Sequence, residues 1–329
     1  MSRSIAVARY EPSQVVERPR VGFIVGPTAV GKSTVALEIA ERLGAEIVNA
    51  DSRQLYRGMD VGTAKPSPAE RRRVRHHLID IATPAAPLDV AEFARRARAV
   101  IAGLVAGGRP VLVVGGSGLY LRAIRGGVFE GPAAAPEVRA RLAMTAADEG
   151  LAGLHRRLAA VDAEAALAIS PNDLRRIVRA LEVYELTGMP ISEHQRRHRF
   201  AAREFASLTI GLTLERARLY EAIDRRFDAM IAAGLVDEVR GLLAAGYDPG
   251  APPLCTIGYR EIASFLRGET TLVEAVAGAK RASRRLAKRQ LTWFRADREI
   301  VWLDAATDAA AAGFELFASF FGYREERPR

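Results

Sequence analysis

The sequence is poor in cysteine and has no long hydrophobic run. Cys255 is the single cysteine among 329 residues, which excludes an intramolecular disulfide and a zinc site built from cysteines. No stretch approaches the length of a membrane span. Residues 1–20 contain four arginines and no apolar core, so we expect a disordered tail rather than a secretory signal. These absences favour a reducing cytoplasm as the location, without membrane contact.

Acidic residues are also in the minority. The chain has 48 Lys and Arg against 39 Asp and Glu, which gives a net charge of +9. Such a balance is typical of proteins with a polyanionic partner, although an arginine-rich genome composition produces the same excess. Hydrophobic residues make up 49% of the chain, which is enough for a sizeable core. The composition therefore indicates a globular protein and leaves its partner open.

The stretch from Val21 to Thr34 is the most informative one. Val21 to Val25 has the apolar pattern of a buried strand, and residues 33–43 have apolar side chains at helical spacing. Between them, GPTAVGKS matches the P-loop template. In such a loop, backbone N–H groups and a helix N-terminus bind phosphate oxygens, and the serine hydroxyl can ligate Mg²⁺. We therefore predict a phosphate or pyrophosphate site, with Ser33 as the metal ligand, formed by Gly26, Pro27, Thr28, Ala29, Val30, Gly31, Lys32 and Ser33.

Two further strand ends carry polar or glycine-rich segments. The stretch Glu46–Asn49 leads into Asp51, so a carboxylate lies at the sheet edge where open α/β sheets bind ligands. A capping role for Asp51 is the alternative. Residues 110–114 form a further expected strand and lead into the glycine loop 115–120. That loop indicates either close approach of the backbone to the same ligand or a tight turn.

The order of the expected elements indicates the fold class. Strands and helices alternate through residues 21–127, as in a P-loop NTPase-like core with a parallel sheet. A strand is also expected at 78–81, and the two histidines before it have no partners at metal-ligand spacing, so we expect a structural role for His76 and His77. Residues 128–204 contain helical patterns only, and strands return at 208–212 and 300–303. We therefore predict an α/β protein with an inserted all-helical domain and a helical C-terminal part.

Two helical segments carry stripes of basic residues. Arg175, Arg176 and Arg179 share one helix, and residues 279–298 hold eight Lys or Arg against one Asp. In the second segment, the basic residues recur at four-residue spacing and form one broad cationic face. Such a stripe is usually a solvated surface, and with this net charge an RNA-binding face is a fair rival.

The P-loop alone leaves two classes of enzyme open. One is a small-molecule or nucleotide kinase with a helical lid. The other is a transferase that holds a pyrophosphate leaving group and acts on a nucleic acid. A nucleotide-switch module is a weaker third, because it needs an acidic residue after an apolar strand and the strand at 111–114 ends in glycines.

Seven motifs, in this order along residues 22–303, resemble those of the tRNA dimethylallyltransferases, also called isopentenyl-pyrophosphate transferases. The motifs are GPTAVGKS, DSRQLY, GMDVGTAKP, VGGSGLYLRA, PNDLRRIVRALEVYELTG, IGYRE and AKRQLTWFR. The resemblance implies transfer of a dimethylallyl group from dimethylallyl diphosphate to the exocyclic N6 amine of the adenosine beside the tRNA anticodon, and a P-loop small-molecule or nucleotide kinase is the alternative. It assigns residues 21–127 and 205–329 to the two parts of the core, the second with basic tRNA-binding helices, and residues 128–204 to a tRNA-binding helical insertion.

The resemblance also implies roles for single residues. Lys32 and the loop amides would hold the diphosphate with Mg²⁺ on Ser33, and Arg226 matches the family's arginine near the diphosphate. Asp51 matches the aspartate of the DS-x-Q-x-Y motif and is the expected general base. Ser117 stands where the family usually has threonine, and its hydroxyl is expected to serve the same reaction channel. No protein partner is implied.

The expected partner is the anticodon stem-loop of tRNA. The positions that match the family's tRNA contacts are Asp51, Ser52, Arg53, Gln54, Ser117, Arg139, Arg175, Arg176, Ile177, Val178, Arg179, Gly258, Tyr259, Arg260, Lys288, Arg289, Gln290, Trp293 and Arg295.

Overall fold

The protein is built around one parallel β-sheet. The computed structural model describes residues 18–127, 131–198 and 204–323. Within these ranges, six strands pair in the order β3-β2-β4-β1-β5-β6, all parallel. The strands are β1 (Arg20–Val25), β2 (Glu46–Asn49), β3 (His76–His77), β4 (Val111–Gly115), β5 (Ala206–Thr213) and β6 (Ile300–Asp304). The P-loop follows β1 at the centre of this sheet, which confirms the predicted fold class.

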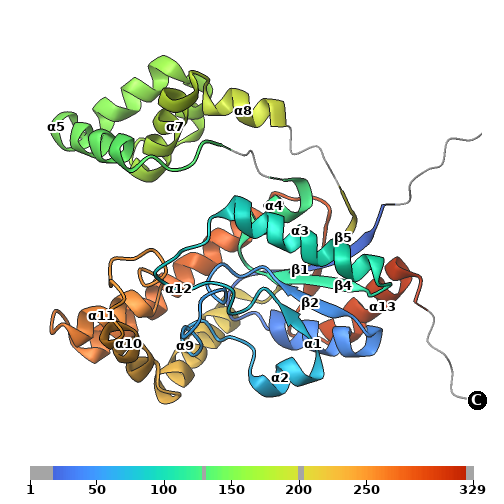
Figure 1. Cartoon of the computed structure of the whole chain (residues 1–329). Helices are drawn as coiled ribbons and strands as arrows, with labels where there is room; N and C mark the ends of the chain where they lie inside the picture. The colour runs from blue at the N-terminus through green and yellow to red at the C-terminus, as the bar shows by residue number, and fades with distance from the viewer. Residues whose placement is uncertain (1–17, 128–130, 199–203, 324–329) are drawn as a thin grey trace, which may run out of the picture.

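Helices cover both faces of the sheet (Figure 1). Helices α1 (Lys32–Leu43) and α13 (Ala309–Phe321) lie on one face, and α3 (Val90–Ala106) and α4 (Gly118–Gly126) lie on the other. Adjacent residues of β1 serve both layers: Phe23 and Ile24 are both fully buried, in different hydrophobic clusters. A strand buried on both faces needs apolar residues at successive positions, and this is why the run at 21–25 does not alternate with polar residues.

A separate group of helices follows α4. It consists of α5 (Pro136–Val161), α6 (Ala163–Ala168), α7 (Leu174–Thr187) and α8 (Ile191–His198), and it stands apart from the sheet in Figure 1. These helices share a hydrophobic cluster of their own, which includes Leu154, Leu158 and Ile177. Because this cluster contains no residue of the sheet, the group buries its apolar faces internally.

The C-terminal part of the chain returns to the sheet and adds further helices. Helices α9 (Arg216–Ala232), α10 (Leu235–Ala244) and α11 (Tyr259–Leu266) lead to the long α12 (Leu272–Arg295), which packs against α9, α11 and α4.

The short α2 (Pro68–Arg73) begins with a capping box between Ser67 and Glu70. None of the described helices has the length and apolarity needed to cross a membrane.

The structure corrects two expectations and adds one helix. The third strand comprises His76–His77 rather than residues 78–81, because Leu78 and Asp80 have φ angles of 60° and 58°, which no strand accommodates. This turn directs the Asp80 carboxylate to Lys65 and Arg71. The predicted tail of residues 1–20 is too long, since Arg20 already belongs to β1. Residues 1–17 lie outside the described part of the chain. Residues 128–130, at the expected start of the insertion, also lie outside it. Helix α13 was not expected from the sequence.

Candidate active site at the carboxyl edge of the sheet

The P-loop leads from β1 into the N-terminus of α1. Lys32 is the first residue of α1, and its Nζ atom donates a hydrogen bond to the carbonyl oxygen of Pro27 at 2.6 Å, across the loop. Ala29 has a φ angle of 64°, a conformation that residues with a side chain rarely adopt. Backbone strain of this kind concentrates at ligand-binding loops. The first turn of α1 has no side-chain cap, so its N–H groups remain available to an anion.

Three charged groups interact beside this loop. The surrounding protein atoms and the Arg226 guanidinium lower the pKa of Lys32 from 10.5 to about 7, while Asp51 acts in the opposite direction. Burial also lowers the pKa of Arg226, and Asp51 again opposes the shift. Two neighbouring cations with one carboxylate between them leave the site short of negative charge. A diphosphate would stabilise the charged form of both cations.

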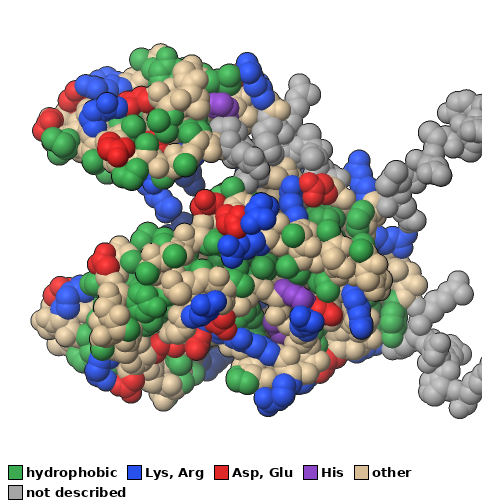
Figure 2. Space-filling model, in the orientation of Figure 1, with side chains coloured by type: hydrophobic (Ala, Val, Ile, Leu, Met, Phe, Trp, Pro, Cys, Tyr) green, Lys and Arg blue, Asp and Glu red, His purple; other side chains and the backbone are tan. Residues whose placement is uncertain are grey.

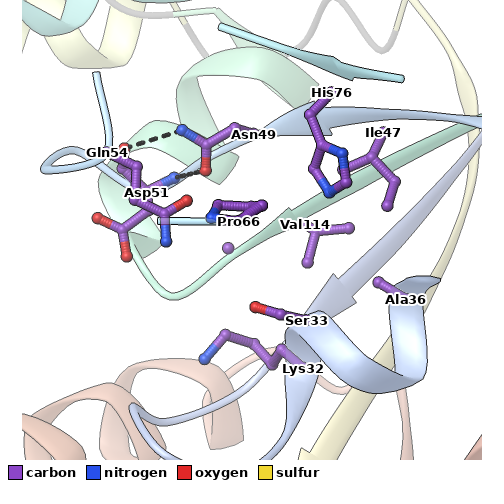
Figure 3. A pocket seen from close by; sticks show the side chains of 11 residues that line it. Lys32, Ser33, Ala36, Ile47, Asn49, Asp51, Gln54, Pro66, His76 and Val114 are labelled. Atoms are coloured by element: carbon purple, nitrogen blue, oxygen red, sulfur yellow. Dashed lines mark hydrogen bonds between the residues drawn. The ribbon is translucent and has the colours of Figure 1, made fainter. Parts of the chain in front are cut away.

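Asp51 is held at the end of β2 by its neighbours. Its backbone N–H donates to Asn49 Oδ1 at 3.0 Å, and its own Oδ1 accepts from the backbone N–H of Arg53 at 2.8 Å. In Figure 3, the Lys32 amine and the Ser33 hydroxyl lie on the α1 side of a cavity of about 40 Å³, and Asp51 lies across from them. The expected convergence of the P-loop and the second strand end is therefore present in the structure.

His76 lines the same cavity, a position that the sequence pattern does not indicate. Its Nδ1 atom lies 2.8 Å from the carbonyl oxygen of Val74, and burial lowers its pKa. Sequence reasoning had set this histidine before its strand, and the structure sets it within β3, beside β2. The position of His76 follows from the pairing of β3 with β2. Periodicity cannot predict that pairing, because β3 has only two residues.

The second glycine loop lies directly beside the Asp51 segment. Ser117 Oγ accepts a hydrogen bond from the backbone N–H of Ser52 at 3.2 Å and lies 3.3 Å from Ser52 Oγ. A Cβ atom on Gly115 would lie 2.3 Å from the Ala50 carbonyl oxygen, and one on Gly118 would lie 2.2 Å from Trp293 Nε1. The glycines are therefore required by close packing of the protein against itself. That packing brings Ser117 next to Ser52, the residue that follows Asp51.

Gln290 joins the two loops to α12. Its Oε1 atom accepts from the backbone N–H of Thr28 at 2.8 Å, and its Nε2 atom donates to the carbonyl oxygen of Gly116 at 2.9 Å. Sequence reasoning placed Gln290 among the tRNA contacts, and that contact stays a prediction. In the structure, the side-chain amide bridges the P-loop and the second glycine loop.

The predicted tRNA-contact residues of α7 and α5 divide into three pairs. Arg175 and Arg176 are exposed, whereas Ile177 and Val178 lie in the core of the helical group. The remaining two, Arg139 and Arg179, donate to the fully buried carboxylate of Glu182 at 2.7 Å and 2.6 Å. The structure thus gives both arginines a partner within the protein.

The basic residues of α12 are divided in the same way. Lys280 forms an ion pair with Asp228 at 2.6 Å, and Arg284 pairs with Asp224 at 2.8 Å, which ties α12 to α9. The other five, which are Arg281, Arg285, Lys288, Arg289 and Arg295, are exposed, and no carboxylate in the described part of the chain pairs with them. Figure 2 shows Lys and Arg side chains reaching into the space between the helical group and the core.

The other predicted contacts near α11 and α12 differ in exposure. Arg260 is exposed and pairs with Glu261, and Trp293 and Arg295 are exposed near the end of α12. Gly258 and Tyr259 are buried, and the Tyr259 hydroxyl donates to Glu238. Glu238 was missed by sequence reasoning, because nothing in the motif pattern distinguishes it from a surface glutamate of α10.

The donor set at the P-loop suits magnesium. Ser33 Oγ and the Asp51 carboxylate face the cavity, and both are oxygen donors. Among the described residues, no three His, Cys, Asp or Glu side chains cluster to form a site made by protein ligands alone. Mg²⁺ commonly binds through one or two protein oxygens, with water and substrate phosphates completing its shell. The residues present therefore fit a substrate-dependent Mg²⁺ site.

Comparison with known proteins shows the family. The sequence pattern of the IPP transferase family matches residues 54–297. The chain is 52% identical to the tRNA dimethylallyltransferase of Geobacter metallireducens over 288 residues, which cover 88% of this chain and 93% of that protein. This chain belongs to the IPP transferase family. The family resemblance drawn from the motifs is confirmed.

Solved structures agree with this assignment. The full-length tRNA isopentenylpyrophosphate transferase of Bacillus halodurans is 39% identical, with a TM-score of 0.69 and coverage of 93% of this chain and 97% of that one. The corresponding transferase of Staphylococcus epidermidis is 32% identical, with a TM-score of 0.67, over 93% of this chain and 100% of that one. A eukaryotic dimethylallyltransferase shares the fold at 24% identity and a TM-score of 0.79, over 94% of this chain and 81% of that one.

Proposed function

We propose that this IPP transferase moves a dimethylallyl group from dimethylallyl diphosphate to the N6 amine of the adenosine beside the tRNA anticodon. The observation that carries the proposal is the convergence of the P-loop, Asp51 and Ser117 on one edge of the sheet, in a chain of this family. The first of these suits a diphosphate, and the second suits an amine that must lose a proton.

The P-loop and Arg226 serve the leaving group. When the allylic C–O bond breaks, its electron pair leaves with the diphosphate, whose growing charge needs neutralisation. Lys32, Arg226 and the amides of the loop supply fixed positive charge at this place, and one preorganised donor of this kind typically contributes about 10²–10³ in rate. Mg²⁺ held by Ser33 would neutralise part of the same charge. The pKa of Lys32 is lowered to about 7 in the protein, so a bound diphosphate would favour its charged form, and Arg226 supplies a second cation beside it.

Asp51 serves the attacking amine. The lone pair of the adenine N6 atom is delocalised into the ring, so this atom becomes nucleophilic only as it gives up a proton. As the N6–C bond forms, the proton passes to the Asp51 carboxylate, which becomes a carboxylic acid. In the described part of the chain, Asp51 Oδ2 receives no hydrogen bond, so it is open to this proton. Ser117 is hydrogen-bonded to Ser52, the residue after Asp51, and so lies on the side of the site where the adenine would bind.

The acceptor is tRNA, whose phosphates match the exposed basic residues of α7 and α12. A stacked adenine cannot reach the P-loop, so the base must leave the stack of the anticodon loop, as in other enzymes that modify bases. A cytoplasmic location is part of the same proposal.

One experiment separates this reaction from that of a P-loop kinase. The protein is incubated with unmodified tRNA and Mg²⁺, with either dimethylallyl diphosphate or ATP, and the digested RNA is analysed by mass spectrometry. We expect an adenosine heavier by one C5H8 unit with the first donor only, and no such product from Lys32→Ala. Phosphate transfer from ATP to a small molecule, without prenylated RNA, would refute the proposal.

A further inference from the structure

Glu238 on α10 receives four hydrogen bonds, and none of the donors belongs to the proposed chemistry. Its Oε2 accepts from the backbone N–H groups of Asp60 at 2.8 Å and Val61 at 2.7 Å. Its Oε1 accepts from the backbone N–H of Gly62 at 3.1 Å and from the Tyr259 hydroxyl at 2.5 Å. A glutamate that was only part of the solvated surface of α10 would not require these four donors. The carboxylate thus holds three consecutive peptide units of the loop between β2 and α2.

The next residues of this loop reach the candidate active site. The carbonyl oxygens of Thr63 and Ala64 accept from Gln54 Nε2 at 3.2 Å and 3.1 Å. The Thr63 carbonyl oxygen also lies 3.5 Å from Arg226 Nη2. Gln54 is buried and follows Asp51 by three residues, and Arg226 is the cation that faces both Asp51 and Lys32. Glu238 is therefore linked by one short backbone segment to Gln54, which lines the cavity, and to Arg226.

Close packing prevents the loop from shifting toward α10 and α11. A Cβ atom on Gly62 would lie 2.5 Å from the Tyr259 ring and 2.8 Å from Leu235. Tyr259 is fully buried, and burial together with Glu238 raises its pKa, so its hydroxyl remains a donor throughout the working pH range. The loop thus has one position, which Glu238 and Tyr259 determine together.

We propose that Glu238 is a positioning residue for the prenyl transfer, acting through the backbone of residues 60–64 on Gln54 and Arg226. The kinetic part of this proposal rests on the proposed function, whereas its effect on diphosphate binding does not. A glutamate that only stabilised the fold would change the melting temperature and leave the chemistry of the folded enzyme as it was. A positioning residue changes the turnover of the folded enzyme as well.

The variant Glu238→Gln tests this in the full chain. Glutamine keeps the shape but turns an amide N–H₂ toward N–H donors, so the loop loses part of its anchor. We expect kcat to fall by roughly tenfold to 10²-fold, because small misplacements of a charged group are costly in a transition state. The KM for tRNA should stay near that of the wild type. Asp237→Asn is the matched control, since that neighbouring carboxylate is exposed and, among the described residues, pairs with Arg240 alone.

The affinity for inorganic pyrophosphate, measured by calorimetry, is compared in a double-mutant cycle that combines Glu238→Gln with Arg226→Lys. If Glu238 acts through Arg226, adding Glu238→Gln to Arg226→Lys should weaken binding less than it does in the wild type. Should Glu238→Gln fold poorly, Tyr259→Phe removes one of the four hydrogen bonds and must show the same changes in smaller size.

Additive losses in this cycle, or an unchanged kcat for the folded variant, would overturn the proposal for Glu238. If instead the wild type forms no prenylated tRNA, the proposed function fails, and the pyrophosphate cycle still decides whether Glu238 places Arg226.

Discussion

Gln290 accepts a hydrogen bond from the backbone N–H of Thr28 at 2.8 Å, across 262 residues of sequence. The same side chain donates to the carbonyl oxygen of Gly116 at 2.9 Å. The last long helix of the chain thus fixes the P-loop relative to the glycine loop that carries Ser117. The two loops follow different strands, β1 and β4, and the Gln290 side chain bridges them.

Gln290→Ala should therefore weaken the binding of inorganic pyrophosphate more than the binding of tRNA. Two hydrogen bonds are lost, at about 0.5–1.5 kcal/mol each, so unfolding should also require less denaturant. Calorimetry with each ligand measures the first effect. Thr292→Ala is the control, because Thr292 donates only to the Lys288 carbonyl oxygen on the same helix. A variant that loses tRNA affinity alone would show that Gln290 contacts RNA instead.

Asp51→Asn should lower the turnover number by about 10²–10⁴, the usual contribution of a positioned general base. Asparagine retains the oxygen that accepts from the Arg53 N–H, so the segment keeps its conformation while the basicity and the negative charge are removed. Affinity for pyrophosphate and for tRNA should stay near wild type, which separates lost chemistry from lost binding. Normal turnover would make Asp51 a positioning group, and His76, on the wall of the same cavity, would then be the next base to test.

The exposed part of the α12 face should carry the salt dependence of tRNA binding. Arg285→Ala with Lys288→Ala removes two cations that have no carboxylate partner in the described residues, and each should reduce the slope of log K against log salt by about one unit or less. Fluorescence anisotropy with labelled tRNA at several salt concentrations measures this slope. The matched control is Lys280→Ala, because that lysine is already paired with Asp228 and should change the slope little. Equal slopes for the double variant and the wild type would mean that the face is only solvated.

The features that the sequence predicted well are those coded locally. The P-loop, the helix that follows it and the strand at Glu46–Asn49 follow from periodicity and from glycine spacing, and family motifs located Asp51 and Ser117. Features that depend on contacts between distant segments were missed. The two-residue strand β3 is defined by its pairing with β2, and the left-handed φ of Leu78 and Asp80 has no local signature.

Side-chain partners were equally out of reach of the sequence. Glu238 looks like any exposed glutamate of an amphipathic helix until the loop at 60–62 is seen to donate to it. The basic stripe of α12 looks uniform, although Lys280 and Arg284 are paired to α9 and its other members are not. Charge counts along a helix cannot separate the two kinds, because the carboxylates that pair lie about 55 residues earlier in the chain.

The helical group depends on one buried acid, and this leads to a prediction with a defined pH dependence. Burial by itself would raise the pKa of Glu182, but hydrogen bonds from Arg139 and Arg179 lower it from 4.5 to about 2. Because the folded-state pKa is the lower one, the stabilisation is complete above pH 4.5 and is lost as the pH falls toward 2. In the wild type, the helical group should therefore keep this contribution at neutral pH.

Replacing both arginines, as Arg139→Ala with Arg179→Ala, should leave the Glu182 carboxylate buried and unpaired, and destabilise the helical group by about 3–5 kcal/mol at pH 7. In that variant the Ala135 backbone N–H still donates to Glu182, but burial acts without the two arginines and raises the pKa of the carboxyl group. Protonation then relieves part of the penalty, and the difference in stability from the wild type should narrow between pH 7 and pH 5. Hydrogen exchange of the α5 and α7 amides at the two pH values measures the difference in stability between variant and wild type. Arg175→Ala is the control, because Arg175 is exposed. If protection is unchanged at both pH values while tRNA affinity falls, the two arginines serve the RNA and Glu182 does not need them.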